Sequence, residues 1–495
     1  MILFFIVLAV AMLAALSLGL VGLSTIEYRT AGQSGHSAQL VQIVQSGIAV
    51  AALAIDSGEK PDIIDNPQLF GNIEVVPAFF MPSGFGSGRC SIFSPNIEQD
   101  QLNGIRFGLT RESAKLSLES ILEWETENPG QGLLSLQKLP GMTPAAIDSI
   151  LDWLDADDNT RPMGAESVWY QQQRKNYRPR NAVPTALEEL LLIRNIDRAM
   201  IFGDDHQSAF GADPATLFFY SSTSLRMDDT FSDLFYDDRA PPSSAWNDGT
   251  FGTQHSIPTS RPASAWQFYL TPYSAEKLVN PQGVVRVYLN EPNLEFLESQ
   301  LRLHRLDEES VQFILTWRRT NGQIDSPLVL LDAEIAVASE TWESPFSCSD
   351  PIRYERFLRL LDEATTHAAV VLHNRINVNE APRLVLEAVP ELSPDITANI
   401  LEQRRYGDAA QRHAVWLLAE NIVDREMMEK LKHRLTTGGD VYRFQVAAMF
   451  DGNVVEGRKI IQRAEVVLDA TVKPVRMAFY KDLTPLGFPD GTNRK

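Results

Sequence analysis

The sequence predicts an α+β protein: a long N-terminal helix packed on a small antiparallel sheet, with a large, mainly helical domain inserted in that sheet. Three observations predict this class. Residues 1–55 contain no proline and are apolar or amphipathic at helical spacing. Strand-like segments occupy 62–110 and return at 440–482. Most of the chain between them has helical periodicity.

The first segment, residues 1–26, is a predicted transmembrane helix. It contains no charged side chain, and about 20 apolar residues suffice to cross a bilayer. A cleaved signal peptide is the alternative. It is disfavoured because no Lys or Arg precedes the run and because the run is longer than a usual signal core.

Residues 27–56 continue as an amphipathic helix, which Ser57, Gly58 and Pro61 bring to an end. We expect one continuous helix. The alternative is a membrane helix followed by a separate core helix.

Composition narrows the classes of function. The chain has 44 Lys+Arg against 64 Asp+Glu, a formal net charge of -20. This balance disfavours sequence-independent binding to nucleic acid, where each phosphate contact needs a basic side chain. At 44% hydrophobic residues the chain is not fully disordered. With only Cys90 and Cys348 it is not a disulfide scaffold, and whether the two are bridged stays open.

The middle of the chain divides by pattern. We assign 113–208 and 265–435 to one inserted, mainly helical domain. Within its second part, 265–290 has strand-like stretches, and helical periodicity covers 291–318 and 350–435. Residues 209–264 are polar, rich in Ser, Asp, Pro and Thr, and predicted to be an insertion or linker. The run at 327–338 is apolar and strand-like, and Asp451–Asn453 (DGN) is predicted to be the turn of a hairpin.

Two segments have the pattern of helix–hairpin–helix units, 133–158 and 377–405. In the first, Thr143 caps and Pro144 opens the second helix, and Ser393 and Pro394 repeat this start in the second. Such units often bind nucleic-acid backbones. Packing against protein is favoured here, because acidic residues that would repel phosphates follow: Asp148, Asp152, Asp155, Asp157 and Asp158.

The end of the first unit also has the spacing of a calcium loop. Oxygen-bearing side chains occupy positions 1, 3, 5 and 12 of an EF-hand-like pattern, namely Asp155, Asp157, Asn159 and Glu166. The pattern departs at position 6, where Thr160 replaces glycine, and at position 8, which is Pro162. The candidate cofactor is therefore Ca²⁺, and the alternative is an acidic, solvated helix end.

Catalytic motifs are absent from the sequence. It contains no HExxH, no GxSxG and no GxxxxGK[ST]. These absences weaken an enzymatic interpretation without excluding one. A membrane-anchored hydrolase would require a Ser/His/Asp or metal cluster, and none is visible at sequence spacing.

In several segments the sequence resembles the K-type minor pseudopilins of the type II (general) secretion system. The most specific segments are RPMGAESVWY (161–170) and YRPRNAVPTALEELLLIRNI (177–196). Four further segments resemble the family in the same order: 107–122, 139–158, 269–290 and 376–389. The first of these departs from the family pattern at Arg111, Ala114, Ser117 and Glu119, and 209–264 has no clear counterpart.

The resemblance implies a pilin-like helix in the inner membrane, a single pass, with the bulk of the chain in the periplasm. It implies other minor pseudopilins and the major pseudopilin as partners, and no nucleic acid. It also implies no enzymatic activity and no small-molecule substrate. The expected role is to initiate pseudopilus assembly at the tip and to limit its length during protein export. Phe5 stands where major pilins carry glutamate. The alternative function is a membrane-anchored helix–hairpin–helix protein that binds DNA, as in competence. The family's short basic leader would precede MILFFIV.

Overall fold

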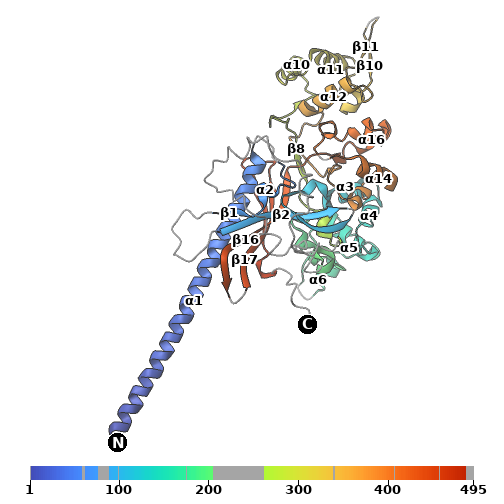
Figure 1. Ribbon diagram of the computed structural model, residues 1–495. Helices are drawn as coiled ribbons and strands as arrows, with labels where there is room; N and C mark the ends of the chain where they lie inside the picture. The colour runs from blue at the N-terminus through green and yellow to red at the C-terminus, as the bar shows by residue number, and fades with distance from the viewer. Residues whose placement is uncertain are drawn as a thin grey trace.

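The computed structural model describes residues 2–57, 62–75, 88–98, 100–173, 176–203, 261–337, 340–405, 407–455 and 458–486. Helix α1 projects from a folded body, and the helices α10 (Leu294–Leu303), α11 (Glu308–Thr320) and α12 (Pro351–Glu363) lie at the end of that body far from the N-terminus (Figure 1). The polar segment predicted at 209–264 lies outside the described residues as far as 260.

Helix α1 runs without a break over Ile2–Asp56, so the two-helix alternative is wrong. At 1.5 Å per residue its length is roughly 80 Å. It contains two stretches long and apolar enough to cross a membrane, Val10–Tyr28 and Ser37–Asp56. None of the first is buried, whereas 44% of the second is buried inside the protein. The first stretch is therefore the candidate anchor, and the second belongs to the folded body.

The second half of α1 packs on an antiparallel sheet. The buried residues of this half of the helix are Leu40, Ile43, Val44, Gly47, Ile48, Val50, Ala51 and Ala54. Gly47 permits the close approach, because a Cβ atom there would lie 3.0 Å from Val446 Cγ1 and 3.2 Å from Cys90 Sγ. The contacting strands are β2 (Gly88–Glu98), β16 (Val441–Val455) and β17 (Arg458–Asp469).

The sheet has eight strands, and its main path is β18-β17-β16-β2-β3-β6. Strand β1 pairs with β2, and β4 pairs with β16. The remaining strands are β1 (Ile73–Val75), β3 (Gln101–Arg106), β4 (Thr110–Arg111), β6 (Arg261–Pro262) and β18 (Arg476–Asp482). Strands from 73–111 and 441–482 thus enclose the helical region in sequence. Cys90 is buried in this layer, and both Cys90 and Cys348 are free thiols.

Three local predictions need correction. Residues 451–453 form no turn: β16 continues to Val455, and a register shift between Met449 and Val454 absorbs the segment as a bulge. The predicted strand at 327–338 begins as a 3₁₀ helix, η5 (Pro327–Leu330), because Pro327 opens it and Ser326 caps it. Only Glu334–Val337 is strand β10, paired with β11 (Glu340–Glu343). Arg261–Pro262, assigned to the polar insertion, is the edge strand beside β3.

The region between β4 and β16 is mainly helical. Several helices start where the sequence predicts, with Thr143 and Ser393 accepting hydrogen bonds from the first turns of α5 and α14. The other helices are α2 (Pro67–Phe70), in the segment predicted to be β-rich, α3 (Leu118–Glu127), α4 (Gln131–Leu136), α5 (Pro144–Leu154), α6 (Ser167–Gln171), α7 (Arg198–Phe202), α13 (Arg383–Glu387), α14 (Pro394–Gln403), α15 (Trp416–Ala419) and α16 (Arg425–Leu431), with 3₁₀ turns η1 (Glu112–Ala114), η2 (Leu187–Leu192), η4 (Trp266–Phe268), η6 (Ala409–Gln411) and η7 (Thr484–Leu486).

Short strand pairs connect these helices. They are β5 (Leu116–Ser117) with β7 (Leu270–Thr271), β8 (Ala275–Lys277) with β13 (Val371–His373), β9 (Val287–Tyr288) with β12 (Ala364–Thr365), and β14 (Ile376–Asn377) with β15 (Leu435–Thr436).

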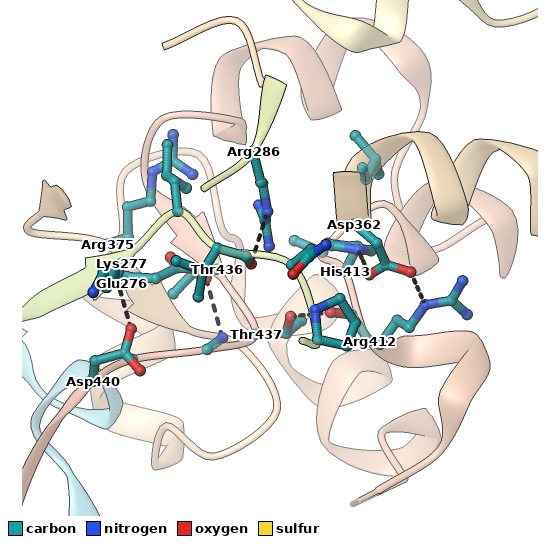
Figure 2. A pocket seen from close by; sticks show the side chains of 18 of the residues that line it. Glu276, Lys277, Arg286, Asp362, Arg375, Arg412, His413, Thr436, Thr437 and Asp440 are labelled. Carbon is teal, nitrogen blue, oxygen red and sulfur yellow. Dashed lines mark hydrogen bonds and ion pairs between the residues drawn. The ribbon is translucent and has the colours of Figure 1, made fainter. Parts of the chain in front are cut away.

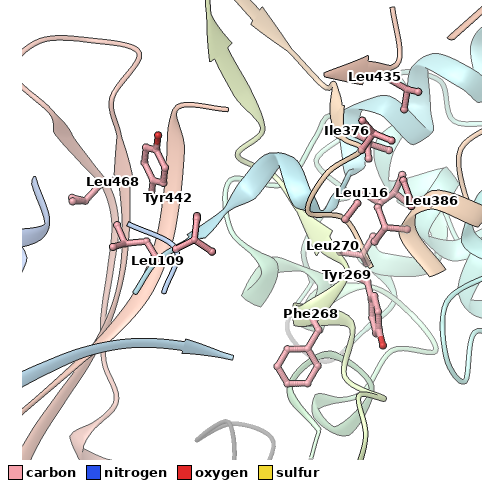
Figure 3. Packing of buried hydrophobic residues seen from close by; sticks show 14 of the residues in the cluster. Leu109, Leu116, Phe268, Tyr269, Leu270, Ile376, Leu386, Leu435, Tyr442 and Leu468 are labelled. Atoms are coloured by element: carbon pink, nitrogen blue, oxygen red, sulfur yellow. The ribbon is translucent and has the colours of Figure 1, made fainter. Parts of the chain in front are cut away.

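A single hydrophobic core joins the sheet to the helical region. Figure 3 shows Leu109, Tyr442 and Leu468 on the sheet side, and Leu116 and Leu270 in the neighbouring part of the helical region. All five side chains are buried. The helical region is therefore packed on the sheet rather than tethered to it.

Candidate functional site

The acidic loop, residues 155–166, connects α5 to α6. Helix α5 ends at Leu154 because its amphipathic pattern stops there, and the carboxylates of the loop follow at once. Trp153 and Tyr170, at the two ends of the loop, pack edge to face with ring centroids 5.2 Å apart. This contact sets the separation between the two ends of the loop.

Glu166 is the unusual side chain of the acidic loop. It is 2% exposed, and neither carboxylate oxygen has a hydrogen-bond partner. Burial, followed by the negative charges of Asp152, Asp155 and Asp158, raises the pKa of Glu166 to about 8. A buried carboxylate with two unsatisfied oxygens is costly unless a proton or a cation neutralises it.

Arg161 neutralises part of this charge. Its Nη1 donates to Asp152 Oδ1 at 2.8 Å and to Asp155 Oδ2 at 2.6 Å. Asp152 is fully buried, and burial raises its pKa while the hydrogen bonds from Arg161 oppose that rise. Gly164 makes room for the carboxylate, because a Cβ atom there would lie 1.9 Å from Asp152 Oδ2. Arg161 therefore forms ion pairs with Asp152 and Asp155, and no ion pair with Glu166 is found among the described residues.

The four predicted ligands lie in different environments. Asp155 Oδ1 is buried without a hydrogen-bond partner, like the two oxygens of Glu166. Asp157 Oδ1 accepts a hydrogen bond from the Asn159 amide at 2.8 Å, and both residues are exposed. Among the described residues, no group of three or more His, Cys, Asp or Glu is gathered at metal-binding geometry.

Two residues beside the acidic loop make contacts that the sequence does not predict. Asp152 is predicted to lie on a face that repels phosphates, but it is buried against Arg161. It lies three residues before Asp155, the C-cap of α5, and this spacing is the signal that both could meet one partner. Asn181 donates from Nδ2 to the Asp157 carbonyl at 3.0 Å, and its Oδ1 is buried without a hydrogen-bond partner. No local pattern predicts that contact.

These oxygens fit a hard cation. Ca²⁺ takes six to eight oxygen ligands from carboxylates, amides, carbonyls and water. Glu166, Asp155 and Asn181 together present four buried oxygens without hydrogen-bond partners. The acidic loop therefore has donors of the required type, although the described side chains are not arranged as a finished site.

The exposed half of α1 is the second functional surface. Large apolar side chains there are mostly exposed, among them Leu13 at 65% and Leu18 at 78%. Gly19 and Gly22 have no atom within 4 Å of a built Cβ, so the surface of the helix is open around them. An apolar surface of this extent is typical of contact with lipid or with other helices.

Helix α1 is apolar and exposed in its first half and docked on an antiparallel sheet in its second half, which suggests a single N-terminal membrane anchor joined to a folded body. A family model described as "Type II secretion system (T2SS), protein K" matches residues 122–202. Over these residues, which include the acidic loop, the recognition of a K-type minor pseudopilin is confirmed.

The comparisons with solved structures and with curated proteins do not extend the family match. One solved structure, the crystal structure of the GspK-GspI-GspJ complex from the enterotoxigenic Escherichia coli type 2 secretion system, is similar with a TM-score of 0.37 and 10% identity, over 92% of this chain and 99% of that chain. At that TM-score the similarity carries no argument about fold or partners. No curated protein matches the chain.

Proposed function

We propose that this protein is a minor pseudopilin at the tip of the type II secretion pseudopilus, where it initiates assembly and limits length during protein export. The observation that carries the proposal is helix α1, whose first half is apolar and exposed while its second half is docked on the sheet. The family match at 122–202 supports the same assignment.

The position of the helical region supports the tip. Its helices α10 to α12 lie beyond the sheet, at the end of the body far from the N-terminus of α1 (Figure 1). In a fibre built from parallel α1 helices, a subunit added above would meet this region. This protein could then have neighbouring subunits beside and below it but none above it, which is the arrangement of a cap.

The expected partners are other minor pseudopilins and the major pseudopilin. The apolar half of α1 would lie in the inner membrane as a single pass, with the bulk of the chain in the periplasm. The role is structural rather than enzymatic, and no nucleic acid or small-molecule substrate is involved. The alternative of membrane-anchored DNA binding draws no support from the family match, and the net charge of -20 opposes it.

We also propose that Ca²⁺ binds the acidic loop. Glu166 and Asp155 would supply the buried oxygens, and Asp157 and Asn159, the other predicted ligands, lie in the same loop. The ion would neutralise the carboxylate of Glu166, which is not paired with Arg161. Its effect would be to fix the closure of the loop between α5 and α6, not to take part in a reaction.

Electron microscopy of purified pseudopili tests the tip position. Fibres would be labelled with a gold-conjugated antibody against this protein, and antibody against the major pseudopilin would serve as the control. The proposal predicts gold at one end of each fibre. Gold spaced evenly along the fibres would contradict the cap, while a complete lack of co-purification with fibres would contradict the pseudopilin assignment itself.

A further inference from the structure

A cavity of about 890 Å³ lies between the C-terminal end of α1 and the helical region. Its lining comes from segments that are distant in sequence, including 54–57, 276–286, 361–367 and 407–415. Figure 2 shows charged side chains of both signs around it, with the Arg286 side chain extending toward the labelled residues in the centre of the view. Neither the acidic loop nor the exposed half of α1 belongs to this cavity.

Two guanidinium groups of the cavity form no ion pair with any carboxylate in the described ranges. Arg286 Nε donates to the Val279 carbonyl at 3.2 Å, and Arg375 Nη2 donates to His367 Nε2 at 2.9 Å. Both arginines are partly buried. Within the part of the chain that the structure describes, neither one forms an ion pair, although other arginines of the same cavity do, such as Arg412 with Asp362.

The acidic groups that act on this pair are engaged elsewhere. Glu276 Oε2 accepts a hydrogen bond from Thr436 Oγ1 at 2.6 Å. Asp362 binds Arg412 and His413, at 2.9 and 2.7 Å. Asp440 and Glu363, which also act on Arg286, accept hydrogen bonds from the Lys277 amide and from Asn280 Nδ2, at 2.6 and 2.8 Å. All four carboxylates therefore accept a hydrogen bond from another group.

The two arginines also act on each other. Burial lowers the pKa of both guanidinium groups, and the charge of Arg286 lowers that of Arg375 further. Burial and the nearby Arg375 hold the pKa of His367 down to about 4, so this ring is neutral at pH 7 and accepts the hydrogen bond from Arg375. Nearby carboxylates compensate the two charges only in part, since burial still lowers the pKa of both arginines and neither forms an ion pair among the described residues.

We propose that the cavity binds a small oxyanion of the phosphate class between Arg286 and Arg375. Guanidinium groups suit this ligand because their planar N–H donors match the oxygens of phosphate, and such charge-assisted hydrogen bonds are strong. His367 is a positioning residue, which holds Arg375 by one Nη and leaves its other donors for the anion. The shared chemistry is the phosphoryl group, whether free or part of a larger solute.

The test uses the full-length protein in detergent, in chloride buffer at constant ionic strength and pH 7. Calorimetric titration with inorganic phosphate and with glycerol phosphate would measure affinity, and the melting temperature would be followed in parallel. Arg286→Gln and Arg375→Gln are the test variants. Arg302→Gln is the matched control, because it removes one positive charge from a surface ion-pair cluster on α10.

We expect phosphate to bind and to raise the melting temperature of the parent and of Arg302→Gln. Arg286→Gln and Arg375→Gln should bind about tenfold more weakly or worse, since each removes a charge-assisted contact. Without phosphate, neither test variant should melt below the parent, because each relieves repulsion. Tighter binding of glycerol phosphate would identify a larger phosphoryl solute as the source, and equal binding would identify the free anion.

Two results would overturn the proposal. One is no heat and no thermal shift with either phosphate compound in the parent protein. The other is an equal response in all four proteins, which would show that phosphate acts through the general charge of the surface. If both test variants failed to fold, Arg286→Lys would replace them. It keeps the charge but loses the fork of donors, and unchanged phosphate affinity in it would also count against the site.

Discussion

Arg443 on β16 donates from Nε to Glu112 Oε1 at 2.8 Å, and this contact joins the sheet to η1, the first turn of the helical region. Glu112 is fully buried and also accepts from Lys115 Nζ at 3.1 Å. Burial alone would raise the pKa of Glu112, but Arg443 and Lys115 lower it to about 2. Glu112 thus pairs with two cations at the junction between the two parts of the protein, and Arg443 has a second carboxylate partner, Glu465 Oε1, at 2.9 Å from its Nη1.

Glu112→Gln should therefore be strongly destabilising. It leaves Arg443 and Lys115 with less compensation in the interior, and breaking a buried pair on one side costs about 3 kcal/mol or more. Urea unfolding would measure the free energy. Glu119→Gln on the exposed face of α3 is the control and should change it by less than about 0.5 kcal/mol. Equal stability of the two variants would show that the junction does not depend on this charge.

The pH dependence of the same junction has a definite sign. Because the pKa of Glu112 in the folded protein, about 2, is below that of an unfolded glutamate, its contribution is present above about pH 4.5. It is lost as the pH falls toward 2. The free energy of unfolding of the parent should fall as the pH is lowered across that window. Its slope against pH should be smaller in Glu112→Gln. An identical slope in both proteins would contradict the assigned pKa.

Calcium should stabilise the protein through the acidic loop. After chelation, adding millimolar Ca²⁺ should raise the melting temperature, since a ligand present at 100 times its Kd contributes about 2.7 kcal/mol. Glu166→Gln should remove most of the shift, and Asp155→Asn should reduce it. The control is Glu308→Gln, an exposed carboxylate on α11, which should retain the full shift. An unshifted parent protein would eliminate the calcium site.

The affinity for Ca²⁺ should rise with pH. Glu166 must lose its proton to bind a cation, and its pKa is about 8 in the ion-free protein. Calorimetry between pH 6 and 8 should therefore show tighter binding at higher pH, with release of a proton. Without Ca²⁺, the raised pKa makes stability fall as the pH rises from about 4.5 to 8, and Glu166→Gln should abolish that fall. A pH-independent affinity would place the ion elsewhere.

Docking of α1 should depend on Gly47. Gly47→Leu would force a side chain into the space held by Val446 and Cys90, and overpacking of this kind typically costs 1–3 kcal/mol. Gly35→Leu makes the same change where a Cβ meets no atom within 4 Å, and it should leave docking intact. Protease sensitivity after residue 57 would report release of the helix. Equal sensitivity of both variants would argue against close docking.

The sequence was sufficient for features set by local pattern. The single helix at 2–56 follows from an uninterrupted apolar and amphipathic period, and the helix starts at Thr143 and Ser393 follow from their caps. The strand-rich segments at both ends of the helical region are also local. A bulge is not local, because it depends on pairing with a second strand. The pairing of β16 with β17 at Met449 and again at Val454 carries the strand through the DGN segment in place of the predicted turn.

The candidate sites depend on contacts between distant residues. Asp152 is buried only because Arg161 folds back over it and Gly164 leaves room, which spacing alone does not show. The proposed oxyanion cavity is lined by both Arg286 and Arg375, which come from segments distant in sequence. Neither arginine stands out in the sequence. Their significance comes from the absence of an ion pair among the described residues, which is a property of the folded protein.

Cysteine cross-linking along α1 in membranes tests the central claim, that this helix packs against other pseudopilins. Gln45 and Ala49 are exposed, whereas the neighbouring Val44 and Ile48 face the protein's own sheet. Gln45→Cys and Ala49→Cys would be made in a Cys348→Ser background, since Cys90 is already buried. Glu295→Cys on α10 is the matched exposed control, at the end expected to be free.

The account predicts that the thiols introduced by Gln45→Cys and Ala49→Cys cross-link to cysteines placed in the helices of other minor pseudopilins, and that the thiol introduced on α10 does not. Mass spectrometry of the products would identify the partner chains. Cross-links from α1 only to a second copy of this protein, or cross-links from α10 to the major pseudopilin as strong as those from α1, would contradict it.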